Sequence, residues 1–143
     1  MLISQLLEAK GRFVATVPPS TSVRAVVSAL TNYRVGALVI SSDGHHVDGI
    51  AAERDIVRAL HRFGPAILDE PVRVIMSTPV WTCAPDERVE QLAMHMTEHR
   101  IRHVPVLDHG ELAGIVSVGD IVKSRIDELE AERRALEDYI SAR

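Results

Sequence analysis

The sequence is poor in the residues on which several classes of protein depend. It has a single cysteine, Cys83, so an intramolecular disulfide and a CxxC metal site are both excluded. Aromatic residues make up only 3% of the chain, which is too few for a base-stacking surface. The net charge of −4 disfavours non-specific binding to nucleic acid, because such binding needs a basic face.

Membrane, export and catalytic signals are also missing. No apolar run approaches the roughly 18 residues of a membrane span, and the first five residues lack the features of a signal peptide. Neither a GxSxG nor a GxxxxGK[ST] motif occurs, and no nucleophile is paired with a base by motif. The hydrophobic fraction of 46% is typical of a globular protein. We therefore expect a cytoplasmic protein without enzymatic activity.

One strand-to-helix corner occurs twice in the sequence. Residues 114–121 read as a short buried strand, then a hydroxyl, a small residue and a carboxylate, and then an apolar helical pattern. Residues 49–56 carry the same corner 65 positions earlier. Upstream, at an offset of 66, the identities are Thr16 with Thr82, Pro19 with Pro85, Val23 with Val89, Thr31 with Thr97 and Arg34 with Arg100. The one-residue change falls in a hairpin turn, where loops tolerate it.

The duplication predicts an α/β fold of two βαββα repeats. Each repeat leaves an apolar face that the other can cover, which gives a pseudo-twofold particle with two related clefts. A short helix or arm ending at Gly11 precedes the first repeat. The expected strands are 13–17, 36–40, 47–52, 80–83, 103–107 and 112–117.

The expected helices carry apolar residues at helical spacing. The first follows a cap at Ser20 or Ser22, the second spans 55–62, the third is capped by Asp86, and the last starts at Ile121. We expect an arm and first repeat over 1–64, a polar linker over 65–73, a second repeat over 74–126 and a C-terminal amphipathic helix over 127–143.

Three stretches carry a resemblance to a known family: residues 74–77 (VIMS), residues 100–106 (RIRHVPV) and the corner at 114–121. Residues 53–57 (ERDIV) match a frequent form of the first corner. In these motifs, over about residues 6–126, the chain resembles a tandem pair of CBS domains, also called a Bateman module. The resemblance implies a disc-like pair of α/β units that binds adenosine-containing ligands in its clefts and that usually regulates without catalysing.

The resemblance places one candidate site at Asp120. Its carboxylate would accept hydrogen bonds from both hydroxyls of a ribose, since it has two acceptor oxygens; the alternative is a cap on the helix N-terminus. Ser117 would lie near the ribose or phosphate. From the other repeat the family pattern adds Thr16, Val35, Gly36 and Ala37, whose backbone would read the adenine edge.

A second candidate site lies at Asp55, with Arg54, Thr82, Ile101, Arg102 and His103. The resemblance makes Arg102 and His103 phosphate-binding cations, and an arginine fork matches phosphate oxygens; the alternative is solvated charge on a loop. Ala52 stands where the second corner has a hydroxyl, and Arg54 replaces a small residue. The sequence therefore favours the Asp120 cleft for ribose and leaves the Asp55 cleft open.

Histidines and the C-terminal tail raise two further questions. His95 and His99 share a helix face, but spacing supplies no third ligand, so no metal site is expected. From Val122 a heptad seam runs to Ile140, interrupted by Arg133. The tail either folds back on its own core or packs on a second subunit, and we expect a homodimer held by the repeats and this helix together.

The sequence thus predicts a regulatory module that binds an adenine nucleotide, AMP first, with ATP or NAD(H) as alternatives, and that uses no catalytic cofactor. A regulated protein partner is expected, and membrane or nucleic-acid partners are not. The alternative is a ligand-free scaffold whose clefts are closed by side chains. A small enzyme acting on nucleotides is a third hypothesis, and no motif supports it.

Overall fold

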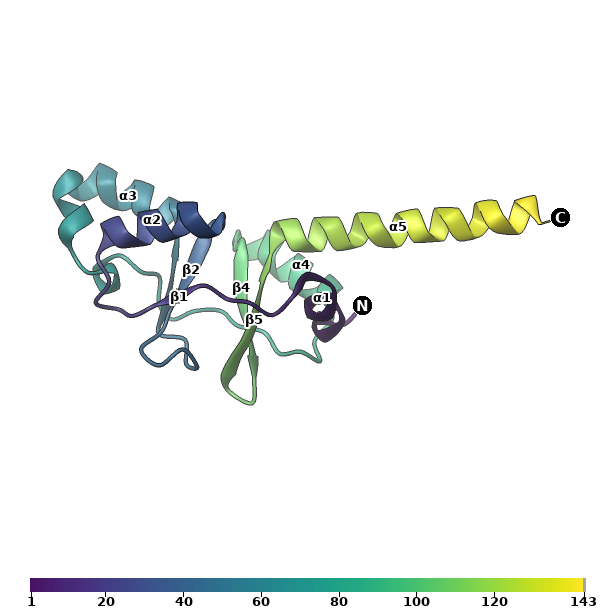
Figure 1. Ribbon diagram of the computed structural model, residues 1–143, viewed down its shortest axis with the longest axis horizontal. Helices are drawn as coiled ribbons and strands as arrows, with labels where there is room; N and C mark the ends of the chain where they lie inside the picture. Colours follow the sequence, from purple (N-terminus) through teal and green to yellow (C-terminus); the bar gives the residue numbers. More distant parts are fainter. Residues whose placement is uncertain (143) are drawn as a thin grey trace.

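The computed structural model describes residues 1–142 and arranges them as two units side by side, with one long helix leaving the second unit (Figure 1). The elements in chain order are α1 (Ile3–Lys10), β1 (Thr16–Val17), α2 (Val23–Tyr33), β2 (Ala37–Ile40), β3 (Gly49–Ala52), α3 (Glu53–Phe63), the 3-10 turns η1 (Pro65–Asp69) and η2 (Val72–Val74), α4 (Val89–His99), β4 (His103–Asp108), β5 (Glu111–Ser117) and α5 (Val118–Ser141). The predicted α/β fold of two repeats with a C-terminal helix is confirmed.

Each unit is built on a small sheet. In the first, β1 runs parallel to β2, and β2 runs antiparallel to β3. In the second, β4 pairs antiparallel with β5. The strand predicted over 80–83 is reduced to a single parallel bridge between Cys83 and Val106. Pro105 of β4 has no amide N–H, so the hydrogen bond that Val39 donates to the Ala15 carbonyl in the first repeat has no counterpart here.

The segment that precedes each repeat packs into the core of the other repeat. Ile3 and Leu7 of α1 are buried with Val104 and Val116 of the second repeat. Val72 of the linker is buried in the first repeat's core instead. Burial of these apolar side chains stabilises each unit and ties the two units together. The domain boundaries remain a prediction, but the arm expected with the first repeat contacts the second.

The helix starts agree with the prediction at α2 and differ from it at α4 and α5. Ser22 caps α2, because its hydroxyl accepts from the Ala25 amide at 3.1 Å. At α4 the N-cap residue is Arg88, and Asp86 is not the cap. The α5 helix starts at Val118 and is capped by Ser117, so the predicted start at Ile121 is three residues late. The corner is therefore tighter than the apolar pattern indicated, and the helix begins directly at the strand end.

The C-terminal helix leaves the body and extends past α1 (Figure 1). Its side chains at Val122, Ile126, Leu129, Leu136 and Ile140 are all exposed, so the tail does not fold back on its own core. Arg143, the last residue of the predicted helix, lies outside the described residues. Within residues 1–142, no helix is both long enough and apolar enough to cross a membrane.

Candidate functional site

Two cavities open where the duplicated corners meet the opposite unit. The Asp55 cleft has a volume of about 460 Å³, and the Asp120 cleft has a volume of about 380 Å³. Gly36 and His103 line both cavities, so they form the wall between them. The junctions that precede β2 and β4 therefore stand at the centre of the module, and each corner faces one of them.

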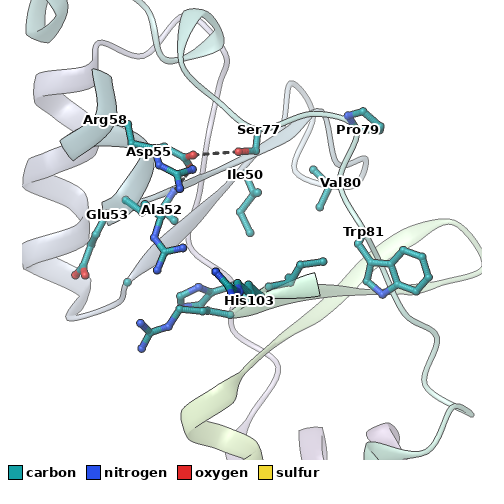
Figure 2. Close-up of a pocket in the computed structure, with 15 residues that line it drawn as sticks. Ile50, Ala52, Glu53, Asp55, Arg58, Ser77, Pro79, Val80, Trp81 and His103 are labelled. Carbon is teal, nitrogen blue, oxygen red and sulfur yellow. Dashed lines mark hydrogen bonds between the residues drawn. The ribbon is translucent and has the colours of Figure 1, made fainter. Parts of the chain in front are cut away.

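Asp55 is fixed at the first turn of α3 by two hydrogen bonds. The Ala52 amide donates to its Oδ2 atom at 2.8 Å, and the Ser77 hydroxyl donates to its Oδ1 atom at 3.0 Å (Figure 2). The carboxylate also complements the positive end of the helix dipole. Each of its oxygens keeps a further lone pair for a ligand donor, because a carboxylate has about four acceptor positions.

Four arginines line the Asp55 cleft. Arg54 and Arg58 come from the first two turns of α3, and Arg100 and Arg102 come from the junction between α4 and β4. Across residues 1–142, no hydrogen bond or ion pair engages any of these four guanidinium groups. Glu53 and Asp55 are the acidic side chains of the same lining, so the wall carries a net positive charge. Such a wall attracts an anion, and forked guanidinium donors match phosphate oxygens.

His103 lies at the base of this cleft in Figure 2, across from Glu53 and Asp55. Its ring is so close to Gly36 that a Cβ atom there would stand 3.2 Å from Cε1 and Nε2. Burial, with the adjacent Arg102 charge, lowers the pKa of His103 below its usual 6.5. The imidazole is therefore neutral at pH 7, and the positive charge predicted for this pair of residues resides on Arg102.

The Asp120 cleft holds a carboxylate that is already engaged. The Ser117 amide donates to Asp120 Oδ2 at 2.8 Å, and the Asp120 amide donates to the Ser117 hydroxyl at 3.1 Å, which is a capping box. The Lys10 ammonium lies 2.6 Å from the same Oδ2 atom and donates to the Ile115 carbonyl at 2.7 Å. The predicted capping role of Asp120 is thus observed in part, with Ser117 as the cap and Asp120 at the third helical position.

Two opposing effects act on the Asp120 carboxyl. Burial raises its pKa, but the hydrogen bonds from Lys10 and from the Ser117 amide outweigh burial and lower the pKa below 3.8. The group is therefore ionised at neutral pH and balanced by the lysine. A ribose diol entering this cleft would share the carboxylate with Lys10 or displace it.

Most predicted site residues line the expected clefts. The Asp120 cleft contains Val35, Gly36, Ala37, Ser117 and Asp120. The Asp55 cleft contains Arg54, Asp55, Ile101, Arg102 and His103. Thr16 and Thr82 line neither; the walls are formed instead by Val14 and Val80, two residues before each. In the first repeat β1 starts at Thr16, and the residues that line the cavity come directly before this strand.

Several lining residues were not predicted. Arg58 follows Arg54 by four residues, so helical periodicity could have found it. Arg34 and Arg100 hold matching positions in the two repeats, both adopt φ of 55°, and each lines one cleft. Lys10 gives no local signal in the sequence, because its role depends on α1 packing against the second unit.

The histidine pair on α4 is geometrically close. The His95 ring lies 4.3 Å from the His99 ring and 3.6 Å from Trp81, on which it stacks. Among residues 1–142, no group of three or more histidine, cysteine, aspartate or glutamate side chains could hold a metal ion. We assign these rings to packing around Trp81, which borders the Asp55 cleft (Figure 2).

Comparisons with known proteins agree with this architecture. The family model for the CBS domain matches residues 11–62 and 72–127. A CBS-domain containing protein from Agrobacterium tumefaciens is 41% identical, with a TM-score of 0.84 over 87% of this chain and 99% of that chain. A CBS domain protein from Pyrobaculum aerophilum complexed with AMP is 32% identical, with a TM-score of 0.74 over 84% and 89%. The CBS domain pair of protein MJ0100, in complex with 5′-methylthioadenosine and S-adenosyl-L-methionine, is 25% identical, with a TM-score of 0.79 over 90% and 98%.

Proposed function

The chain belongs to the CBS-domain family as a tandem pair of repeats, and on that premise we propose that it is a regulatory module for a phosphorylated adenosine ligand. Two relatives of known structure hold AMP, or 5′-methylthioadenosine and S-adenosyl-L-methionine, and all three ligands contain adenosine. CBS-domain pairs are generally regulatory modules without catalysis, and we propose the same here, in a cytoplasmic setting. AMP is the first candidate, with ATP or NAD(H) as alternatives.

The four unpaired arginines of the Asp55 cleft are the observation that carries the proposal. They supply a cationic wall beside a fixed carboxylate, which together suit the phosphate and the ribose of one nucleotide. We therefore assign phosphorylated ligands to the Asp55 cleft, whereas the sequence alone favoured the Asp120 cleft. The change follows from Lys10, which already neutralises Asp120. The Asp120 cleft stays the candidate for an uncharged nucleoside.

Calorimetric titration with AMP, ATP, NADH and adenosine tests the assignment. Loss of a charged hydrogen bond costs about 1.5–3 kcal/mol, so Arg102→Ala should weaken AMP binding roughly 10- to 100-fold. Adenosine, which has no phosphate, should bind the variant as it binds the wild-type chain. Arg134→Ala, on the exposed part of α5, is the matched control and should leave both affinities unchanged. Equal weakening of AMP and adenosine would remove Arg102 from the phosphate site.

The second candidate function is a ligand-free scaffold. It is favoured by one observation, that both Asp55 oxygens already accept hydrogen bonds within the protein. Thermal unfolding with the same nucleotides separates the two functions, because a ligand that binds the folded state raises the melting temperature by mass action. A scaffold shows no shift with any of them.

We also propose that the module is a homodimer. The apolar side chains along α5 are exposed over most of the helix length, and a lone apolar stripe of this kind is typical of a surface that packs on another helix. The outer faces of the repeats complete the contact in this proposal. Sedimentation analysis measures the state directly.

A further inference from the structure

One face of α5 is apolar, exposed and continuous along the helix. Val122, Ile126, Leu129, Leu136 and Ile140 are between 47% and 68% exposed. Their spacing alternates between four and three residues when Arg133 is counted, which is the heptad pattern of a two-helix seam. We call these six positions the α5 seam.

The seam faces away from the body to which the helix is attached. On the opposite side of the first turns, Ile121, Ser124 and Glu128 are half-buried and border a groove against α4. The Ser124 hydroxyl lies 3.1 Å from the Met1 sulfur, which fixes that side of the helix against the N-terminus. A second helix can therefore approach the seam along its whole length, and Figure 1 shows that α5 projects freely beyond α1 and α4.

We propose that α5 pairs in antiparallel orientation with α5 of a second copy of this chain, and the proposal rests on the homodimer proposed above. The alternation of four- and three-residue steps along the seam is the same in both chain directions, so an antiparallel partner presents the same spacing. Val122 faces the partner's Ile140, Ile126 faces the partner's Leu136, and Leu129 faces the partner's Arg133. All six positions thereby find a seam residue opposite, with none left over.

Arg133 decides between the two orientations. In a parallel pair, Arg133 would face the partner's Arg133 inside the seam, where like charges repel at close range. In the antiparallel pair Arg133 faces the partner's Leu129 and lies beside the partner's Glu130. On its own helix the guanidinium already pairs with Glu137 at 2.9 Å, so its stem can lie along apolar surface while its charge stays balanced. Arg133, which interrupts the apolar seam, therefore disfavours the parallel alignment.

The charges that flank the seam are compatible with the same orientation. Antiparallel pairing brings Lys123 next to the partner's Glu137 at both ends of the contact. The two copies of Glu130 then meet near its centre on one side of the seam, and the two copies of Glu132 meet on the other side, where the two Arg133 side chains offset part of the repulsion. Complementary flanking charges set partner orientation in paired helices.

A parallel pair also has flanking contacts of both signs. It offers one attractive pair on each side, between Arg125 and the partner's Glu130; Arg125 also pairs with Glu128 of its own helix at 3.1 Å, just as Glu137 pairs with Arg133. It also sets Glu132 against the partner's Glu137 on each side, and these carboxylates repel. Flanking charges of both signs therefore occur in either orientation, and the facing Arg133 side chains inside the seam are what acts against the parallel alignment.

Cross-linking of single-cysteine variants tests whether the two α5 helices pair in antiparallel orientation. Residue 123 lies next to the partner's residue 137 in the antiparallel pair, with an axial offset of ~3 Å, whereas the two copies of 123 are ~24 Å apart and the two copies of 137 are ~18 Å apart. Native Cys83 does not interfere, because it is buried and burial raises its pKa to about 12. The variants Lys123→Cys and Glu137→Cys are each treated alone, and then mixed, with a short bis-maleimide.

The expected result is a covalent dimer in the mixture and none with either variant alone. Efficient cross-linking of each variant alone would contradict the antiparallel alignment and overturn the proposal. A dimer by sedimentation without any cross-link would overturn it too, while leaving the proposed homodimer standing. A monomer at all concentrations would overturn both, and nucleotide binding would be unaffected by any of these outcomes.

Seam substitutions give a second, independent measurement. Leu136→Glu places a charge in the seam opposite Ile126 and should raise the dissociation constant of the dimer at least tenfold. Ala131→Glu, at the axial centre of the pairing but on the outer face of the helix, is the control and should leave the constant unchanged. Both positions are exposed in the single chain, so neither change disturbs its core. An unchanged constant in Leu136→Glu would exclude α5 from the interface.

Discussion

The contact between Lys10 and Asp120 joins the N-terminal arm to the second corner, and its removal tests that coupling. Lys10 ends α1, and its ammonium reaches both Asp120 Oδ2 at 2.6 Å and the Ile115 carbonyl at 2.7 Å. The substitution Lys10→Met keeps most of the apolar stem and removes the charge and the donors. We expect the variant to fold and to be less stable at neutral pH.

The expected loss is moderate. A hydrogen bond to a charged group contributes about 1.5–3 kcal/mol when it is shielded, and exposed ion pairs contribute about 0–1 kcal/mol. The two side chains are 27% and 23% exposed, which lies between these limits. We therefore expect a loss of roughly 1–2 kcal/mol in the free energy of unfolding, equivalent to about 3–8 °C in melting temperature for a chain of this size.

The lowered pKa of Asp120 makes the free energy of unfolding depend on pH. The pKa of Asp120 is lowered in the folded state relative to 3.8, so the unfolded chain takes up the proton first as pH falls. The stabilisation is present above pH 3.8 and is lost as pH falls through the lower, folded-state value. Lys10→Met should remove this contribution and flatten the acid limb of the stability curve.

Urea unfolding of Lys10→Met, Asp120→Asn and the double variant provides the measurement. The amide introduced by Asp120→Asn would still accept from the Ser117 amide, so the capping box is kept and the cycle isolates the charge pair. We expect a coupling free energy of about 1 kcal/mol at neutral pH that vanishes in acid. Additive effects at neutral pH would refute the reasoning, since they would mean that the two groups do not interact in solution.

Two further predictions concern packing and titration. A Cβ atom at Gly114 would stand 2.7 Å and 2.9 Å from the δ-carbons of buried Leu7, so Gly114→Ala should lower the free energy of unfolding in urea by about 1–3 kcal/mol. The control Gly119→Ala should not destabilise the chain, because the nearest atom to its Cβ would be 3.6 Å away. Equal effects of the two substitutions would contradict this packing. Because the pKa of His103 is lowered below 6.5, the unfolded chain binds its proton first and stability should fall as pH decreases below 6.5. His103→Gln should lessen that fall, and an NMR titration of His103 with a midpoint at or above 6.5 would show the premise to be wrong.

The duplicated sequence predicted the fold because the pattern that forms each repeat is local. The βαββα order, the Ser22 cap and the continuous apolar run of β2 can all be read within a few residues. The strand predicted over 80–83 failed because its pairing depends on a backbone donor of the facing strand β4, and proline stands there at position 105. The start of the last helix was predicted three residues late, at Ile121, because a hydroxyl, a glycine and a carboxylate are common both at a strand end and in a first helical turn.

The site was harder to predict than the fold, since its chemistry depends on contacts between distant segments. Arg102 and Asp55 were found because they belong to motifs, and both line one cavity. The lysine that engages Asp120 lies 110 residues earlier in the chain, on an arm that crosses to the other unit. No spacing rule connects them, so the sequence alone could not show that one carboxylate is already neutralised.

This difference between the clefts gives the duplication a functional consequence. Two identical corners would bind two identical ligands, but the arm supplies a cation to only one of them, and the junction before β4 supplies arginine to the other. A phosphate would therefore find four unpaired arginines in the Asp55 cleft, whereas in the Asp120 cleft it would find one arginine, Arg34, beside a preformed ion pair. Because α1 contacts the N-terminal part of α5 as well as Asp120, a ligand that displaces Lys10 would act on the base of the same helix whose exposed seam we assign to the partner. A ligand can shift such an arrangement only by binding one state more tightly than the other, and competition with Lys10 for Asp120 supplies a difference of that kind.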